Sequence, residues 1–391
     1  MRAQRIYLDH SATTPLRVEA AEAMRAALAK SDFNPSSLHA EGRRARALLD
    51  DARQRVADSL GAAANEITFT SGGTESDNLA IAGVAQAALG PSHVIASAVE
   101  HSAVLASLER LEADGVETTR LPVNSDGLVD VERFEAALRP HTVLASIAYA
   151  NNEIGTIQPI AELSRIARRH GVLFHSDAVA AAGWLPLDLA ALGVDLLSLS
   201  AHKFGGPKGA GLLYIRRGVP IASQLRGGGQ ESGRRAGTED LLGIVGMAAA
   251  LELAIREQVT EAPRVAALRD RLEAGILAAI PGVRVVAAAA ARLPNTLNVG
   301  FTGVDSAALL IALDLAGIAV SAGSACASGM PEPSHVLAAL HLDPEWQRGA
   351  IRFSLGHVTG AAEVERTIEL LPSIVAGLRP AHPATAGGWV D

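Results

Sequence analysis

The stretch SLSAHKFGGPKGAGLLYIR, residues 198–216, decides how the rest of the chain is interpreted. It starts within an apolar run, residues 194–199, passes through a glycine-rich turn and enters a second apolar run, residues 211–215. Short apolar runs bounded by glycines predict two buried strands. His202 and Lys203 follow the first strand directly. Side chains at the carboxyl ends of parallel strands project into the crevice where such sheets bind ligands.

The amine of Lys203 is the most informative group in this stretch. Small residues surround it, so it can be partly desolvated, which suits an amine that forms a Schiff base. A surface lysine in a turn explains the same residues equally well. The choice depends on what the neighbouring strands bring to the same edge of the sheet.

Further apolar runs precede this stretch, and segments of helical composition separate them. Residues 17–30 and 41–60 also have the composition of amphipathic helices. Strands that are apolar on both faces and alternate with helices predict an α/β fold, with a mostly parallel sheet covered on both sides. The apolar runs are residues 66–70, 93–97, 142–149 and 172–175, and helical segments between them include residues 102–113 and 160–170.

The glycine triplet at residues 227–229 marks a break in composition. Beyond it, residues 240–257 and 261–280 predict two long helices, and a strand–helix–strand–helix pattern runs from residue 283 to about residue 378. This pattern predicts a smaller α/β domain. The predicted organisation is an N-terminal segment, residues 1–15, that packs with the small domain, a large domain, residues 16–250, and the small C-terminal domain, residues 251–391.

Composition limits the class of protein. The chain has 391 residues, of which 49% are hydrophobic, and a net charge of -8, so a disordered chain is excluded. The acidic balance argues against a nucleic-acid or anionic-membrane partner, and no apolar stretch approaches the roughly 20 residues of a membrane span. Cys326 is the only cysteine, so an intrachain disulfide is impossible, and we expect a soluble cytoplasmic protein.

Asp177 stands at the end of another apolar run, in VLFHSDAVAAAG, residues 172–183. It lies one predicted strand before Lys203. A buried carboxylate beside a lysine suits the protonated ring nitrogen of a cofactor that the lysine holds. An aspartate at a strand end is more often a turn or helix cap, so its value as a signal comes from the pairing with Lys203.

The segment FTSGGTESDNLAIAG, residues 69–83, carries a strand into a helix through two glycines. Free backbone N–H groups at a helix start, together with hydroxyl groups, predict a cradle for an anion such as a phosphate. The spacing matches neither a P-loop nor a dinucleotide-binding fingerprint. The alternative is an ordinary helix cap by Ser71 or Thr74.

Four more polar residues stand where chemistry is expected. His101 follows a strand and is placed either over an aromatic cofactor or as a helix cap, and Asn152 either binds a ligand or occupies a turn. Cys326 lies among small residues in IAVSAGSACASGMPEPSHVL, which suits an accessible nucleophile better than a core cysteine. Arg352, in AIRFSLG, is either a bidentate carboxylate ligand or a surface arginine.

Taken together, these segments resemble the cysteine desulfurases of the NifS/IscS type, pyridoxal-phosphate enzymes of the class V aminotransferase superfamily. The resemblance covers nearly the whole chain and rests on an ordered set of motifs. It implies the α/β fold type I of such transferases, with a sheet of the seven-stranded type and a smaller C-terminal domain. The motifs are IYLDHSATTP, NPSSLHAEG, TSGGTESDN, EHSAVL, NNEIGTIQPI, SAHKFGGPKGAG, GGGQESGRRAGT, NVGF, SAGSACASG and IRFSLG.

The resemblance implies a set of contacts to pyridoxal 5'-phosphate. Lys203 would hold the cofactor covalently and later move protons at the substrate Cα. Asp177 would pair with the pyridine nitrogen, and His101 would stack on the ring. Thr238 would reach the phosphate from the partner subunit, which implies a homodimer. Asn152 would also contact the cofactor. Within the subunit, the phosphate would be bound by Gly73, Thr74, Ser200 and His202.

The resemblance also implies the reaction. Asn152 and Arg352 would position L-cysteine, Arg352 through its carboxylate. Cys326 would attack the substrate sulfur, leaving a persulfide on the enzyme and releasing L-alanine. The sulfur would go to an iron–sulfur scaffold or another acceptor protein, and Cys326 would at most ligate a cluster transiently; no other metal is expected. The short link from Cys326 to EPSHVL resembles the IscS/NifS branch rather than the SufS branch.

Two positions depart from the family pattern. Ala180 stands where a glutamine usually bonds the ring oxygen of the cofactor, and Ala236 stands where serine is common. These departures keep alternatives open. They are another superfamily activity, such as a selenocysteine lyase, another β-eliminating lyase or an aminotransferase, and a catalytically weakened paralogue that serves as a sulfur-transfer scaffold. An aminotransferase has no need of Cys326.

Overall fold

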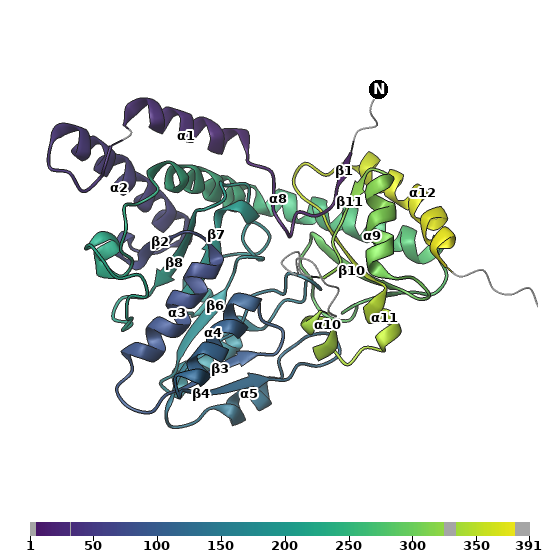
Figure 1. Ribbon diagram of the computed structural model, residues 1–391, viewed down its shortest axis with the longest axis horizontal. Coiled ribbons are helices and arrows are strands. Elements are labelled where there is room, and N and C mark those ends of the chain that lie inside the picture. The colour runs from purple at the N-terminus through teal and green to yellow at the C-terminus, as the bar shows by residue number, and fades with distance from the viewer. Residues whose placement is uncertain (1–4, 32, 324–333, 380–391) are drawn as a thin grey trace, which may run out of the picture.

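The computed structural model describes residues 5–31, 33–323 and 334–379. Its centre is a seven-stranded sheet with the order β2-β8-β7-β6-β5-β3-β4 (Figure 1). Only β8 runs against the others, pairing antiparallel with both of its neighbours, so the predicted mostly parallel sheet is confirmed. The strands are β2 (Ile67–Thr70), β3 (His93–Ser97), β4 (Glu117–Leu121), β5 (Thr142–Ser146), β6 (Leu173–Asp177), β7 (Leu196–Ser200) and β8 (Gly211–Ile215).

Helices cover both faces of this sheet. On one face, Ile81 of α3 (Gly73–Ala87) and Leu108 of α4 (Ser102–Ala113) pack with Leu144 and Leu196. On the other face lie α2 (Ala40–Leu60), α6 (Ile160–Arg169) and the first part of α8 (Leu241–Ala279). The remaining elements of this part are α1 (Val18–Lys30), α5 (Val131–Ala137), α7 (Leu189–Leu192) and the short 3-10 turns η1 (Ala64–Glu66), η2 (Ala201–Lys203) and η3 (Gln230–Gly233).

A second hydrophobic core gathers the C-terminal elements. The antiparallel sheet β12-β10-β9 forms its base, and β1 pairs in parallel with β11 beside it. Leu8, which follows β1, shares this core with Phe301, Phe353 and Leu371, all fully buried, and each such side chain contributes about 1.5–3 kcal/mol by leaving water. The elements are β1 (Ile6–Tyr7), β9 (Val283–Val285), β10 (Thr296–Phe301), β11 (Ile318–Ala319), β12 (Ala350–Ser354), α9 (Ser306–Leu315), α10 (His335–Ala339), α11 (Pro344–Arg348) and α12 (Ala361–Leu378).

The long helix α8 corrects the prediction of two helices, residues 240–257 and 261–280. It runs without a break through Pro263, which costs about 3 kcal/mol inside a helix. Leu251 before the proline is buried in the first core, and Val265 and Leu272 after it are buried in the second, so packing on both sides offsets this local cost. The predicted domain boundary at residue 250 falls inside α8. The division of the chain into domains at residues 15 and 250 stays a prediction. Within the described ranges, no helix is both long and apolar enough to cross a bilayer.

Candidate active site at the carboxyl ends of the strands

A cavity of about 180 Å³ opens where β6 and β7 end, beside the start of α3 and the loops that follow β3 and β5. The structure brings most of the predicted site residues to this one cavity. Its walls also include Asp77 and Asn151, which were not predicted, and Ala180. The predicted residues that line it are Gly73, Thr74, His101, Asn152, Asp177, Ser200, His202 and Lys203.

Lys203 reaches the cavity from η2, the turn that follows β7 directly. Its Nζ donates hydrogen bonds to the backbone carbonyl oxygens of Ser11 and, at 3.0 Å, of Ala12. The same N-terminal segment contacts the turn again, because the Thr13 hydroxyl lies 3.2 Å from Nδ1 of His202. The half-buried amine is therefore held at the cavity wall by the N-terminal segment, which rules out a freely exposed turn lysine.

The start of α3 has the features of an anion site. Its N-cap, Gly72, makes no side-chain cap hydrogen bond, so the alternative of a cap by Ser71 or Thr74 is not what the structure shows. A Cβ atom at Gly73 would lie 2.8 Å from a methyl carbon of Val179, so only glycine leaves this approach open. The N–H groups and dipole of the first turn of α3 thus face the cavity that Gly73 and Thr74 line.

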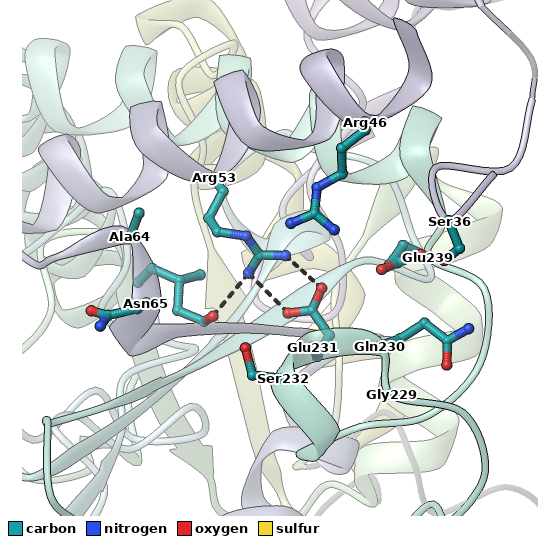
Figure 2. Close-up of a pocket in the computed structure, with 11 residues that line it drawn as sticks. Ser36, Arg46, Arg53, Ala64, Asn65, Gly229, Gln230, Glu231, Ser232 and Glu239 are labelled. Carbon is teal, nitrogen blue, oxygen red and sulfur yellow. Dashed lines mark hydrogen bonds and ion pairs between the residues drawn. The ribbon is translucent and has the colours of Figure 1, made fainter. Parts of the chain in front are cut away.

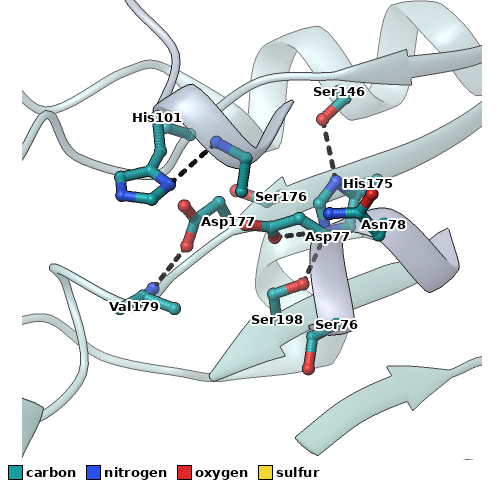
Figure 3. A network of polar contacts seen from close by, with 12 residues as sticks. Ser76, Asp77, Asn78, His101, Ser146, His175, Ser176, Asp177, Val179 and Ser198 are labelled. Carbon is teal, nitrogen blue, oxygen red and sulfur yellow. Dashed lines mark hydrogen bonds and ion pairs between the residues drawn. The ribbon is translucent and has the colours of Figure 1, made fainter. Parts of the chain in front are cut away.

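Asp177 ends β6, and its buried side chain lines the cavity; Figure 3 shows the polar groups around it. Its Oδ1 accepts a hydrogen bond from the backbone N–H of Val179 at 2.8 Å, so it does cap a turn while it also lines the cavity. Burial raises the pKa of the Asp177 carboxyl, while the hydrogen bond from Val179 and the charge of Lys203 lower it. A cation placed in the cavity would favour the ionised form further.

His101 and His202 both line the cavity and also make contacts within the protein. His101 is the N-cap of α4, and its Nδ1 accepts a hydrogen bond from the N–H of Ala103 at 3.1 Å, which leaves Nε2 to carry the ring proton. Burial and the charges of Lys203 and Lys208 lower the pKa of His202 to about 4. His202 is therefore neutral at physiological pH and able to donate one hydrogen bond to an anion.

Arg352 lies in β12 and is 1% exposed. Its guanidinium donates to Oδ1 of Asp9 at 2.8 Å and to the backbone oxygen of Asn152 at 3.0 Å, while its Nε has no hydrogen-bond partner. The side chain is not among the residues that line the cavity, but Asn152 connects the two. The alternative of a surface arginine is wrong. A charged side chain that is buried this deeply normally has ionic or hydrogen-bonding partners.

Thr238 does not join the other predicted residues at this cavity. Thr238 is exposed and does not line the cavity of its own chain. The segment before it borders a larger hollow of about 670 Å³, where Arg53 grips the carboxylate of Glu231 with both terminal nitrogens (Figure 2). Cys326 lies outside the described residues. Across the described ranges there is no group of three or more acidic, histidine or cysteine side chains that suits a metal ion.

Polar groups that the sequence did not single out support the site from behind. Glu100 is buried, accepts the Ser97 hydroxyl at 2.5 Å and binds the N–H of Ala148 with both oxygens at 3.0 Å, which ties the loops after β3 and β5 together. Burial raises its pKa to about 8. Asn151 holds the second loop through three hydrogen bonds to the backbone. The sequence could have indicated His175 as a residue near the site, because it lies two residues before Asp177 and therefore on the same face of the strand.

Comparisons with known proteins agree with this arrangement. The aminotransferase class-V family model matches residues 6–367. The chain is 48% identical over 379 residues to cysteine desulfurase IscS of Dictyoglomus turgidum, covering 97% of this chain and 96% of that protein. A solved NifS-like protein has a TM-score of 0.90 at 38% identity, covering 96% of this chain and 100% of that one. A structure of SspA in complex with cysteine has a TM-score of 0.79 at 35% identity, covering 90% and 98% of the two chains. The chain belongs to the class-V aminotransferase family and, within it, to the cysteine desulfurases of the NifS and IscS type.

Proposed function

We propose that the protein is a pyridoxal-phosphate-dependent cysteine desulfurase that converts L-cysteine to L-alanine and places the sulfur on Cys326 as a persulfide. The observation that carries the proposal is the meeting of the Lys203 amine, the buried Asp177 carboxylate and the start of α3 in one cavity. The relatives named cysteine desulfurase, and the related SspA structure with cysteine, support the same substrate.

The residues present fit the cofactor. Lys203 would hold it through the amine, Asp177 would pair with the ring nitrogen, and His101 would lie against the ring. The open approach at Gly73 and the neutral His202 suit the phosphate, which these two residues would bind together with Thr74 and Ser200. When bound, the cofactor supplies an electron sink that eases removal of the Cα proton and cleavage of the bond between Cβ and sulfur.

Substrate recognition falls to Arg352 and Asn152. The fork of a guanidinium matches a carboxylate, and Arg352 is buried and oriented by its contacts to Asp9 and to the Asn152 backbone. Arg352 therefore binds the carboxylate of L-cysteine, and the Asn152 side chain orients the bound substrate. Burial makes this contact strong, because little water competes for either charge.

Proton transfer at Cα is the task of Lys203. In its neutral form the amine takes the proton, and the carbonyl oxygens of Ser11 and Ala12 accept hydrogen bonds from the ammonium that results. These carbonyls hold Nζ at the cavity wall in the described structure. They therefore limit where the base can stand, which favours transfer at one carbon of the substrate.

The sulfur step balances without an outside oxidant. The thiolate of Cys326 attacks the substrate sulfur, the bond between Cβ and sulfur breaks, a sulfur–sulfur bond forms, and Cβ takes a proton. L-cysteine and a protein thiol thus become L-alanine and a protein persulfide. The persulfide then serves an acceptor, such as an iron–sulfur scaffold or a protein of thio-cofactor assembly.

The assembly and the location are part of the same proposal. The exposed position of Thr238, away from the cavity of its own chain, suits a residue that reaches the phosphate of a partner subunit in a homodimer. A cytoplasmic location follows from the use of Cys326 as a free thiol, because reducing compartments keep such thiols available.

The experiment follows the cofactor and both products in one preparation. The purified protein should absorb visible light as a lysine-bound pyridoxal cofactor does, change its spectrum with L-cysteine, and form alanine and sulfide in equal amounts when a reductant is present. Cys326→Ala should keep the spectrum and lose sulfide formation. Sulfide release that survives unchanged in Cys326→Ala would contradict the persulfide route, and a protein without the visible absorption would contradict the cofactor.

A further inference from the structure

Asp77 is a buried carboxylate that the proposed reaction does not use. It projects from the second turn of α3, is 1% exposed and lines the cavity one helical turn after Gly73. Figure 3 shows its side chain between Asp177 and the pair His175 and Ser198. It therefore stands directly behind the carboxylate that faces the cofactor ring.

The neighbouring imidazole does not balance a charge on Asp77. Nδ1 of His175 lies 2.8 Å from the Ser146 hydroxyl, and Nε2 lies 2.9 Å from the Ser198 hydroxyl, so both ring nitrogens have close partners. Nε2 is 3.7 Å from Oδ1 of Asp77, beyond hydrogen-bond distance. Complete burial lowers the pKa of His175 to about 3, so this ring is neutral at physiological pH.

The surroundings of Asp77 disfavour an ion. Its Oδ1 is buried and has no hydrogen-bond partner within the described part of the chain, and an ionised carboxylate needs several such partners. The charged groups that face it are acidic: Asp177 from β6 and Glu100 from the loop after β3. Burial first, and then the charge of Asp177, raises the pKa of the Asp77 carboxyl well above its usual range, although a hydrogen bond from the Ser198 side chain acts in the opposite direction. The positive charge of Lys203 acts on Asp177 instead.

We propose that Asp77 is a positioning residue that stays a protonated carboxyl behind Asp177, so that Asp177 is the single anion offered to the ring nitrogen of the cofactor. The inference rests on the proposed function only for the identity of that ring nitrogen. Two carboxylates this close in a buried site cannot both ionise at low cost, so the proton on Asp77 allows Asp177 to keep its charge. At alkaline pH, loss of that proton would place a second negative charge behind Asp177.

The matched variant is Asp77→Asn, which keeps the shape and removes the titration. A carboxyl whose folded pKa is raised contributes stability below its unfolded pKa and loses it as the pH rises towards the folded value. The cofactor-free protein should therefore lose stability as the pH rises above the ordinary pKa of an aspartate, and Asp77→Asn should lose less over the same range. Glu100 is present in both proteins, so the difference between them isolates Asp77 and its effect on Asp177. The measurement is the urea midpoint of unfolding at each pH.

The second readout is binding of the cofactor. Asp77→Asn should bind pyridoxal phosphate at neutral pH within about threefold of the wild type, because the amide is neutral like the acid it replaces. Asp177→Asn should weaken binding by about tenfold or more, because its charge is lost. Equal pH dependence of unfolding in the wild type and Asp77→Asn would overturn the proposal. Tenfold weaker cofactor binding by Asp77→Asn would do the same, because it would show that the Asp77 charge is needed.

A third measurement covers the case in which Asp77→Asn does not fold. Infrared spectroscopy of the cofactor-free wild-type protein, labelled with carbon-13 at its aspartates, should show a protonated aspartic acid at neutral pH, and its persistence in Asp177→Asn would assign the signal to Asp77 rather than to Asp177. Absence of that signal would refute a protonated Asp77. These readings use protein without cofactor or substrate, so they keep their meaning even if the protein releases no sulfur from L-cysteine.

Discussion

Arg352 and Asp9 form an ion pair at 2.8 Å although 343 positions separate them in the chain. The N-terminal segment that carries Asp9 continues to Ser11 and Ala12, whose carbonyl oxygens accept hydrogen bonds from Lys203 at the cavity wall. One short segment therefore holds both the proposed carboxylate-binding group and the proposed base. This explains how a β12 residue and a turn residue after β7 keep a common orientation.

Substitution of Arg352 tests substrate recognition. Arg352→Lys keeps the charge but loses the fork, so the KM for L-cysteine should rise by roughly 30-fold, which corresponds to about 2 kcal/mol. Steady-state kinetics checks this, and Arg348→Lys, an exposed position on α11, is the matched control. An unchanged KM in Arg352→Lys, with a protein as stable as Arg348→Lys, would show that another group binds the carboxylate.

The cofactor attachment can be mapped because the chain has only three lysines, Lys30, Lys203 and Lys208. Borohydride reduction followed by peptide mapping should place the pyridoxyl group on Lys203. Lys203→Ala should lose that label and at least about 100-fold in alanine formation, the range expected for loss of a general base. Lys208→Ala, an exposed lysine in the same turn, should keep both. A label on Lys208 would disprove the assignment.

Gly73 tests the phosphate cradle. Gly73→Ala would bring its Cβ to 2.8 Å from a methyl carbon of Val179, a stiff side chain next to the cavity, and overpacking of this kind costs about 1–3 kcal/mol. Cofactor affinity should fall by about tenfold or more. Gly377→Ala, near the end of α12 with open space around it, is the control. Equal cofactor affinities in the two variants would remove Gly73 from the cradle.

Glu100 gives a pH dependence with a definite sign. Burial raises its pKa to about 8, so the folded state keeps a proton that the unfolded state releases above its ordinary value near 4.5. Its contribution to stability is present below that ordinary value and is lost as the pH rises towards 8. Glu100→Gln should therefore lose less stability on going from acid to alkaline pH, measured by denaturant unfolding.

Exposed Glu117 is the control for Glu100, because its contacts with His141 and Arg139 lower its pKa instead. Glu117→Gln should not relieve the alkaline loss of stability. The same result for both glutamine variants would mean that burial of Glu100 does not set the slope.

Mixed dimers test whether Thr238 serves the partner subunit. With Lys203→Ala in one subunit and Thr238→Val in the other, one complete site remains if Thr238 acts across the interface. With both changes in the same subunit, no complete site remains, and cofactor affinity at the surviving lysine should fall by roughly tenfold. Purified mixed dimers with one tagged subunit provide the measurement. The reverse ranking of the two arrangements would place Thr238 in the site of its own subunit.

The sequence predicted the bounds of a strand accurately where apolar residues form the whole strand. It predicted them less accurately where the strand ends in polar residues of the site. The predicted strands at residues 93–97 and 211–215 and the helix at residues 102–113 match β3, β8 and α4. β6 continues to Asp177 rather than ending at residue 175, because its last residues are polar groups buried against α3 and the loop after β5. Hydropathy cannot detect a strand end that is polar and buried.

The supporting residues were harder to predict from the sequence than the groups that line the cavity. Lys203 and Asp177 stand out because strand ends expose them to the crevice. Asp77 and Glu100 act through partners on other elements, and the sequence carries no local mark of those contacts. The sequence also did not predict that one helix continues through Pro263. Packing of α8 against two separate cores keeps the helix continuous, and this packing has no local mark in the sequence.

The destination of the sulfur atom tests the central proposal most directly. Protein loaded with cofactor is mixed with L-cysteine labelled with a heavy sulfur isotope, without reductant, and its peptides are analysed by mass spectrometry. The prediction is one labelled sulfur on the peptide that contains Cys326, in equal amount with the first alanine formed, and none in Lys203→Ala. Alanine formed with no labelled sulfur on Cys326 would contradict the account.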